Sequence, residues 1–113
     1  MNNIVEHRPW GSFEKFDLEG VVSIKVIQVN PNKRLSLQYH LRRDEYWKIL
    51  YGNPVVTVDN KQFQARPGME FYIKRGTNHR IMCEDDQAIF LELCYGIFDE
   101  EDIIRVSDDY GRV

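Results

Sequence analysis

Short segments with alternating apolar and polar residues recur along the chain, and turn signals separate them every eight to twelve residues. Regular short strands between such turns are typical of a β-sandwich or barrel. No segment before residue 99 has a helical period. The pattern therefore predicts an all-β fold of antiparallel strands, with one short helical turn after Asp99, where the carboxylates that follow would lie at the positive end of the helix. The expected strands are 12–16, 22–29, 35–40, 45–51, 55–58, 62–65, 70–73, 79–83 and 88–95.

The strand expected at residues 35–40 is apolar on the face formed by Leu35, Leu37 and Tyr39. A half-exposed antiparallel sheet would carry polar residues there, so a second sheet or a partner subunit must cover this face. Large exposed apolar patches are uncommon on soluble monomers, and we therefore expect a homodimer.

The opposite face of this strand carries possible metal ligands. Gln38 and His40 lie two residues apart and should project together, and Glu45 can reach the same point from the next strand. His79, in a later block, would complete a set of four donors. Such donors suit zinc, iron, manganese or nickel. The alternative is that both histidines belong to the core and are satisfied by hydrogen bonds.

Two blocks, residues 32–52 and 68–83, resemble the paired motifs of the cupin superfamily in spacing. Three framework positions differ from the pattern: Asn32 replaces a glycine, Lys74 a proline and Cys83 an asparagine. Gln38 occupies the position of the first motif histidine. In this the motif resembles that of phosphomannose isomerases of the cupin type, which use Gln, His, Glu and His around zinc. The resemblance implies a metal site at Gln38, His40, Glu45 and His79, with zinc as the first candidate.

Further motifs narrow the resemblance to the type II mannose-6-phosphate isomerase family, which also forms the C-terminal domain of bifunctional mannose-1-phosphate guanylyltransferases. It covers nearly the whole chain and implies one cupin domain, a double-stranded β-helix or jelly-roll barrel, over residues 1–113. These motifs are at residues 7–13, 34–38, 45–47, 76–80, 101–105 and 109–112.

Interconversion of an aldose and a ketose phosphate moves a proton between C1 and C2, so a base must lie beside the metal. Glu92 interrupts an apolar strand and would have a raised pKa if it pointed into a pocket. Lys25 interrupts the strand at 22–29 and matches a lysine common in the family. The alternatives are an exposed strand glutamate and a surface lysine whose stem lies along the sheet.

Three residues are candidates for substrate binding. Arg34 and Ser36 have the same strand parity as Gln38 and should face the same cavity, where an arginine and a hydroxyl can hold a phosphate. Arg43 matches the family motif.

Size and charge limit the function classes. The 113 residues suffice for one domain, and 15 basic against 18 acidic residues give a net charge of −3 without a basic run. This argues against a nucleic-acid surface and favours a small molecule or a second copy as partner. Cys83 and Cys94 form no CxxC motif, and no signal segment or membrane-spanning run is found, so we expect buried reduced thiols in a cytoplasmic protein.

The first hypothesis is a metal-dependent isomerase of mannose 6-phosphate and fructose 6-phosphate in polysaccharide biosynthesis. A second is a non-catalytic cupin that binds a sugar phosphate or nucleotide sugar and serves a separate guanylyltransferase. A third is a metal-dependent oxygenase or another small-molecule cupin enzyme, against which Gln38 in place of histidine argues.

Overall fold

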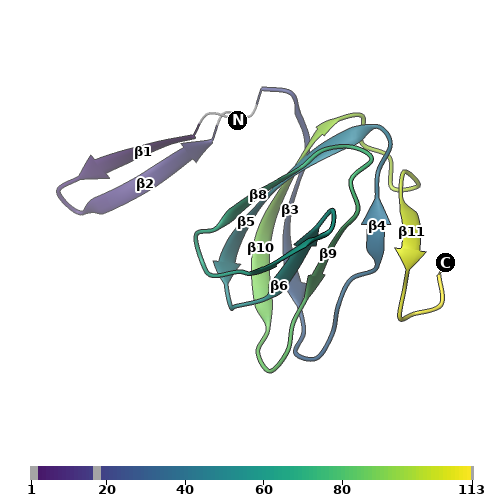
Figure 1. Ribbon diagram of the computed structural model, residues 1–113. Helices are drawn as coiled ribbons and strands as arrows, with labels where there is room; N and C mark the ends of the chain where they lie inside the picture. The colour runs from purple at the N-terminus through teal and green to yellow at the C-terminus, as the bar shows by residue number, and fades with distance from the viewer. Residues whose placement is uncertain (1–2, 17–18, 113) are drawn as a thin grey trace.

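The computed structural model describes residues 3–16 and 19–112, and these form eleven strands and no helix (Figure 1). All strand pairs are antiparallel, as predicted. In the described part of the chain, no helix is available that could span a bilayer. One sheet has the order β3 (Val21–Val29), β10 (Ala88–Gly96), β5 (Arg43–Tyr51), β8 (Glu70–Ile73). The other has the order β11 (Ile104–Ser107), β4 (Leu37–Tyr39), β9 (His79–Met82), β6 (Val55–Val58), β7 (Lys61–Gln64). Strands β1 (Asn3–Arg8) and β2 (Gly11–Phe16) form a separate hairpin.

The hydrophobic core lies between the two larger sheets. Alternate residues of β5 and β10 point inward, so Trp47, Ile49 and Phe90 are buried against Val56 and Ile81 of the opposite sheet. Trp47 and Phe90 have ring centroids 4.7 Å apart. Because inward residues recur at every second position, Glu45, which precedes Trp47 by two residues on β5, is directed between the sheets as well.

Two turns place a residue other than glycine in the left-handed conformation. Asn32, in the position of a motif glycine, has a φ of 60°, and Asp59 has a φ of 58°. Asparagine and aspartate tolerate this left-handed conformation better than other residues that carry a Cβ. Asp59 and Asn60 form the two-residue turn of the hairpin that joins β6 to β7.

The structure adds two strands that the pattern did not predict, β1 and β11, and does not show the helical turn expected after Asp99. The amide of Asp102 donates to the carbonyl of Asp99 at 2.9 Å, and that of Ile103 to Glu101 at 2.8 Å, before the chain enters β11. The Asp102 carboxylate also accepts the amides of Leu41 and Arg42, and its carbonyl contacts the His40 ring; these contacts hold the segment against the barrel instead of in a helix.

The prediction that Leu35, Leu37 and Tyr39 lie together on one outer face is wrong for Leu35. Strand β4 begins only at Leu37, and the backbone before it is irregular. Leu35 therefore packs against the core, while Leu37 lines a hollow on the outer face of the five-stranded sheet. The three residues do not form one exposed stripe, and a dimer cannot be argued from them.

Candidate metal site

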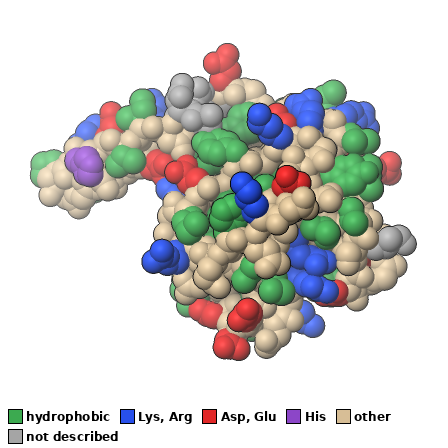
Figure 2. Space-filling view, viewed as in Figure 1, with side chains coloured by type: hydrophobic (Ala, Val, Ile, Leu, Met, Phe, Trp, Pro, Cys, Tyr) green, Lys and Arg blue, Asp and Glu red, His purple; other side chains and the backbone are tan. Residues whose placement is uncertain are grey.

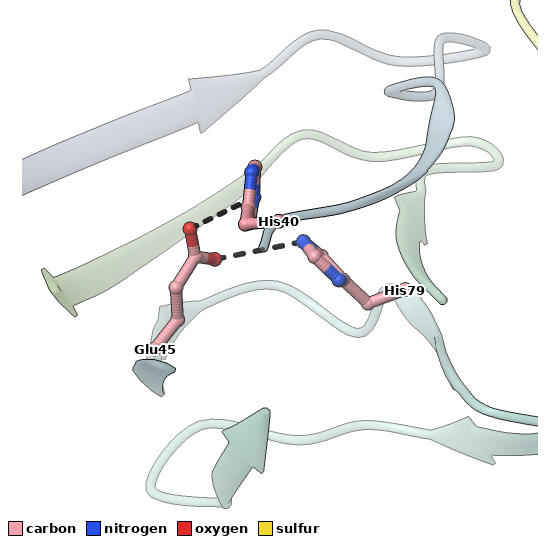
Figure 3. A group of neighbouring side chains, drawn as sticks. All are labelled: His40, Glu45 and His79. Atoms are coloured by element: carbon pink, nitrogen blue, oxygen red, sulfur yellow. Dashed lines mark ion pairs between the residues drawn. The ribbon is translucent and has the colours of Figure 1, made fainter. Parts of the chain in front are cut away.

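Three buried side chains from both sheets meet between the sheets (Figure 3). His40 follows β4, Glu45 lies on β5 and His79 begins β9. The Nε2 atom of His40 is 3.1 Å from one carboxylate oxygen of Glu45, and Nε2 of His79 is 3.6 Å from the other. The two rings have centroids 5.0 Å apart. These residues thus converge as the sequence motif predicted.

Backbone carbonyls determine which nitrogen of each ring faces the site. Nδ1 of His40 lies 2.6 Å from the carbonyl oxygen of Asp102, and Nδ1 of His79 lies 2.9 Å from that of Thr77. A carbonyl only accepts, so each neutral ring must carry its proton on Nδ1. Both Nε2 lone pairs are then directed at Glu45, which is the arrangement of metal-bound histidines whose other nitrogen is held by a hydrogen bond.

Gln38 belongs to the same cluster, because it pairs directly with His79 across β4 and β9. Its Oε1 atom is buried and accepts no hydrogen bond from the described residues, and Nε2 of His79 is likewise buried without such a partner. An unsatisfied buried polar atom costs about 1–3 kcal/mol. A divalent cation would satisfy both atoms together with Glu45 and His40, so the residues present fit a metal ion.

The carboxylate of Glu45 is fixed in orientation and charge. Trp47 Nε1 donates to its Oε1 at 3.0 Å, and Arg43 Nε donates to its Oε2 at 3.0 Å. Burial opposes ionisation, but the interaction with His40 and the positive charge of Arg43 outweigh it and lower the pKa of Glu45 to about 2. Burial lowers the pKa of His79, which favours the neutral ring. An ionised carboxylate beside neutral imidazoles is the ligand state a metal requires.

A second group of possible ligands, Glu45, Glu92 and Cys94, adjoins the first. The Cys94 thiol donates to Glu92 Oε1 at 3.5 Å. Burial, followed by the negative charges of Glu92 and Glu45, raises the pKa of Cys94. Since the thiolate is the form that binds metal, a thiol that stays protonated makes this group the poorer site. Cys83 and Cys94 are both free and buried, as expected.

Glu92 and Lys25 are directly opposite each other on β10 and β3. Glu92 is buried, and burial together with the charge of Glu45 raises its pKa to about 7. The Lys25 ammonium is 3.2 Å from a carboxylate oxygen of Glu100 and 4.9 Å from the ring centroid of Phe98. Both residues thus border the ligand cluster, with Glu92 on its inner side and Lys25 toward solvent.

The three predicted substrate-binding residues are in different environments. Ser36 is buried near the start of β4. Arg43 is buried beside the ligands, with Nη2 3.3 Å from His40 Nε2. Arg34 makes a two-pronged salt bridge with Asp109 at 2.7 and 2.8 Å and lines a hollow on the outer face. The parity argument for Arg34 is wrong, because the irregular backbone at residues 34–36 interrupts the alternation.

Sequence reasoning missed two residues that support the ligands, Trp47 and Asp102. The buried Asp102 carboxylate accepts the amides of Leu41 and Arg42 at 2.9 and 3.0 Å, while its carbonyl holds His40. Trp47 orients Glu45. Both occur in family motifs, which was the available signal, but their contacts depend on chain segments that are distant in sequence.

Comparison with known proteins agrees with this geometry. The sequence profile of the family "Mannose-6-phosphate isomerase C-terminal" matches residues 2–108. The chain belongs to this family. The two sheets form the cupin, or double-stranded β-helix, fold. The solved structure of ChmJ, a 3'-monoepimerase from Streptomyces bikiniensis in complex with dTDP-quinovose, superposes with a TM-score of 0.71 at 14% identity, covering 92% of this chain and 66% of that one.

Two curated relatives are longer proteins. The alginate biosynthesis protein AlgA of Pseudomonas aeruginosa is 36% identical over 113 residues, covering 98% of this chain and 24% of the relative. A mannose-1-phosphate guanylyltransferase of Escherichia coli is 32% identical over 111 residues, covering 95% of this chain and 23% of the relative. The chain thus spans about a quarter of the length of these relatives.

Proposed function

We propose that this chain is a metal-dependent isomerase that interconverts mannose 6-phosphate and fructose 6-phosphate. The observation that carries the proposal is the convergence of two imidazole Nε2 atoms and the Glu45 carboxylate in one buried site, next to Gln38, which pairs with His79 and whose Oε1 is buried and unsatisfied. Glu92 beside this cluster supplies a candidate base.

The residues divide into ligands and reacting groups. Gln38, His40, Glu45 and His79 would hold a divalent ion, with zinc first because its usual ligands are nitrogen and oxygen donors in sets of this size. Bound there, the ion would act as a Lewis acid on the sugar oxygens.

Glu92 would take the proton from one of the carbons C1 and C2 and return it to the other. A carboxyl group with a pKa of about 7 is present in both protonation states near neutral pH, as this task requires.

Lys25 and Arg43 are the cations best placed for the phosphate of the substrate. Both cations contact the ring of Phe98, whose centroid is 4.9 Å from Lys25 Nζ and 4.9 Å from Arg43 Cζ. Lys25 is paired with an exposed carboxylate, Glu100, which a phosphate can replace at little cost, since exposed ion pairs contribute about 0–1 kcal/mol. A phosphorylated substrate of this kind is consistent with a cytoplasmic enzyme.

A second function follows from the length of the relatives. One of them is named a guanylyltransferase, and this chain matches 23% of it. A cupin that binds a sugar phosphate or nucleotide sugar without turnover, and acts with a separate guanylyltransferase in polysaccharide biosynthesis, is therefore the alternative.

Elemental analysis of protein purified without a histidine tag tests the ligand set. Wild type should hold about one metal ion per chain, and His40→Ala and His79→Ala should hold little, because imidazole is a strong donor to such ions. His7→Ala is the matched control, since His7 is exposed on the hairpin. An unchanged metal content in His79→Ala would contradict the assignment, provided that circular dichroism shows folded protein.

A coupled assay of mannose 6-phosphate isomerisation, with calorimetric binding of the same sugar, separates the two functions. Turnover that requires His79 supports the isomerase. Binding without turnover in metal-loaded wild type would favour the binding module.

A further inference from the structure

The β1–β2 hairpin extends from the body of the protein (Figure 1). It is anchored at its root, where Glu14 forms an ion pair with Lys48 and the ring of Phe16 lies 6.2 Å from that of Tyr46. Lys48 and Tyr46 are on β5, so the anchor lies on the outer face of the four-stranded sheet. A two-stranded hairpin alone is marginally stable in water, and packing along its length is what normally maintains such an element.

Large apolar side chains lie exposed on this hairpin, as the space-filling view shows (Figure 2). Trp10 at the turn is 74% exposed, and its ring stacks on that of Phe13 at 6.4 Å. Ile4 and Val5 on β1 are each more than half exposed. Residues of this kind are normally buried, so the hairpin presents an apolar surface that the described residues of the chain leave uncovered.

A second unpartnered apolar surface lies on β3. Val22, Ile24 and Val26 occupy alternate positions on its outer face and are 47%, 55% and 66% exposed; we call these three residues the β3 stripe. Strand β3 is nine residues long and forms an edge of its sheet. A long apolar edge strand of this kind invites pairing with another chain.

One copy of the chain cannot bring the two surfaces together. The hairpin is anchored over β5, and Asn3 also contacts Glu70 of β8, on the side of the sheet remote from β3. It extends away from the body, and the molecule measures 50 × 34 × 21 Å with a radius of gyration of 14.7 Å. A compact domain of this length has a radius of about 13 Å. The two apolar surfaces are therefore complementary in chemistry and separated in space.

We propose that two copies of this chain exchange hairpins, so that the hairpin of each copy covers the β3 stripe of the other. A two-fold axis allows this arrangement, because each copy offers one surface of each kind and both contacts form at once. The hairpin region is also part of the fold shared with ChmJ, since the superposition covers 92% of the chain, a share that residues 19–113 alone cannot reach.

Mass and affinity measurements by light scattering and analytical ultracentrifugation test the exchange. Wild type should have twice the monomer mass of 13.5 kDa at micromolar concentration. The hairpin variant Trp10→Ser/Phe13→Thr and the stripe variant Ile24→Thr/Val26→Thr should each weaken the dimer at least tenfold. Val106→Thr is the matched control, because Val106 is 49% exposed on β11 of the other sheet and should leave the dimer unchanged.

Mixing the two variants distinguishes exchange from other dimers. A mixed pair retains one intact contact, between the normal hairpin of the stripe variant and the normal stripe of the hairpin variant. The mixture should therefore associate more tightly than either variant alone. A wild-type monomer, a variant that dimerises like wild type, or a mixture without recovery would each overturn the proposal. Circular dichroism and cooperative melting confirm that the variants, all at exposed positions, remain folded.

Discussion

Replacement of Glu92 by glutamine should stabilise the metal-free protein relative to wild type, and this difference should grow as the pH rises. Burial and the charge of Glu45 raise the pKa of Glu92 from 4.5 to about 7. A raised pKa means that the folded state favours the neutral carboxyl group. The contribution of neutral Glu92 to the free energy of unfolding is therefore fully present below pH 4.5 and is lost as the pH rises through 7. A shift of roughly 2.5 units corresponds to about 3 kcal/mol. Glutamine stays neutral and avoids the loss.

Urea unfolding of both proteins with chelator present, at several values between about pH 4 and pH 8, measures this difference. The unfolding free energy of Glu92→Gln minus that of wild type should rise by about 3 kcal/mol over the range. Glu45, with a pKa of about 2, stays ionised throughout and cancels between the proteins. Glu84→Gln, in an exposed turn, is the control for loss of one carboxylate. A difference that is independent of pH would show that Glu92 is not held in a buried, charged environment.

The same substitution tests the catalytic role. If Glu92 is the base, Glu92→Gln should lower the turnover of mannose 6-phosphate by about 10²–10⁴. Substrate affinity should change much less, because a base acts mainly in the transition state. Equal turnover in the two proteins would remove Glu92 from the mechanism and make Lys25 the first candidate.

Two further substitutions test the structure around the site. Asp102→Ala should destabilise the protein by about 2 kcal/mol or more, since two amides lose a charged acceptor, and it should also weaken metal binding measured by chelator competition. Gly52→Ala should destabilise more than Gly68→Ala in thermal melts: both glycines have φ near 90°, but only at Gly52 would a Cβ meet a neighbour, 2.3 Å from the carbonyl oxygen of Gln87. Equal losses in the two alanine variants would refute that steric argument.

Local patterns predicted most of the fold. Alternation and turn residues gave the nine strands from β2 to β10 within a few residues, because each depends on its own sequence. β11 was missed because it forms only by pairing with β4, where Ile104 is opposite Tyr39. The prediction of a helical turn failed for a similar reason, since the contacts of Asp102 with the amides of Leu41 and Arg42 and with the His40 ring outweigh the local preference.

The ligand cluster was predictable for a different reason. Motif spacing predicted that Gln38, His40, Glu45 and His79 converge; strand geometry brings the last three together and pairs Gln38 with His79. Arg34 shows the limit of parity arguments, which fail wherever a strand is interrupted. The supporting roles of Trp47 and Asp102 could not be derived in this way, because both depend on side-chain directions fixed by packing.

The fold and the site are specified by the same alternation. Glu45 precedes Trp47 and Ile49 on the inward face of β5, and His79 precedes Ile81 on that of β9. A slip of one residue in either strand would turn the ligand and the core residues outward together. Burial of the apolar residues thus fixes the register that directs Glu45 and His79 at each other from opposite sheets. The packed core offsets the cost of burying polar groups, so Gln38 Oε1 and His79 Nε2 can remain without a hydrogen bond from the described residues and available to a cation.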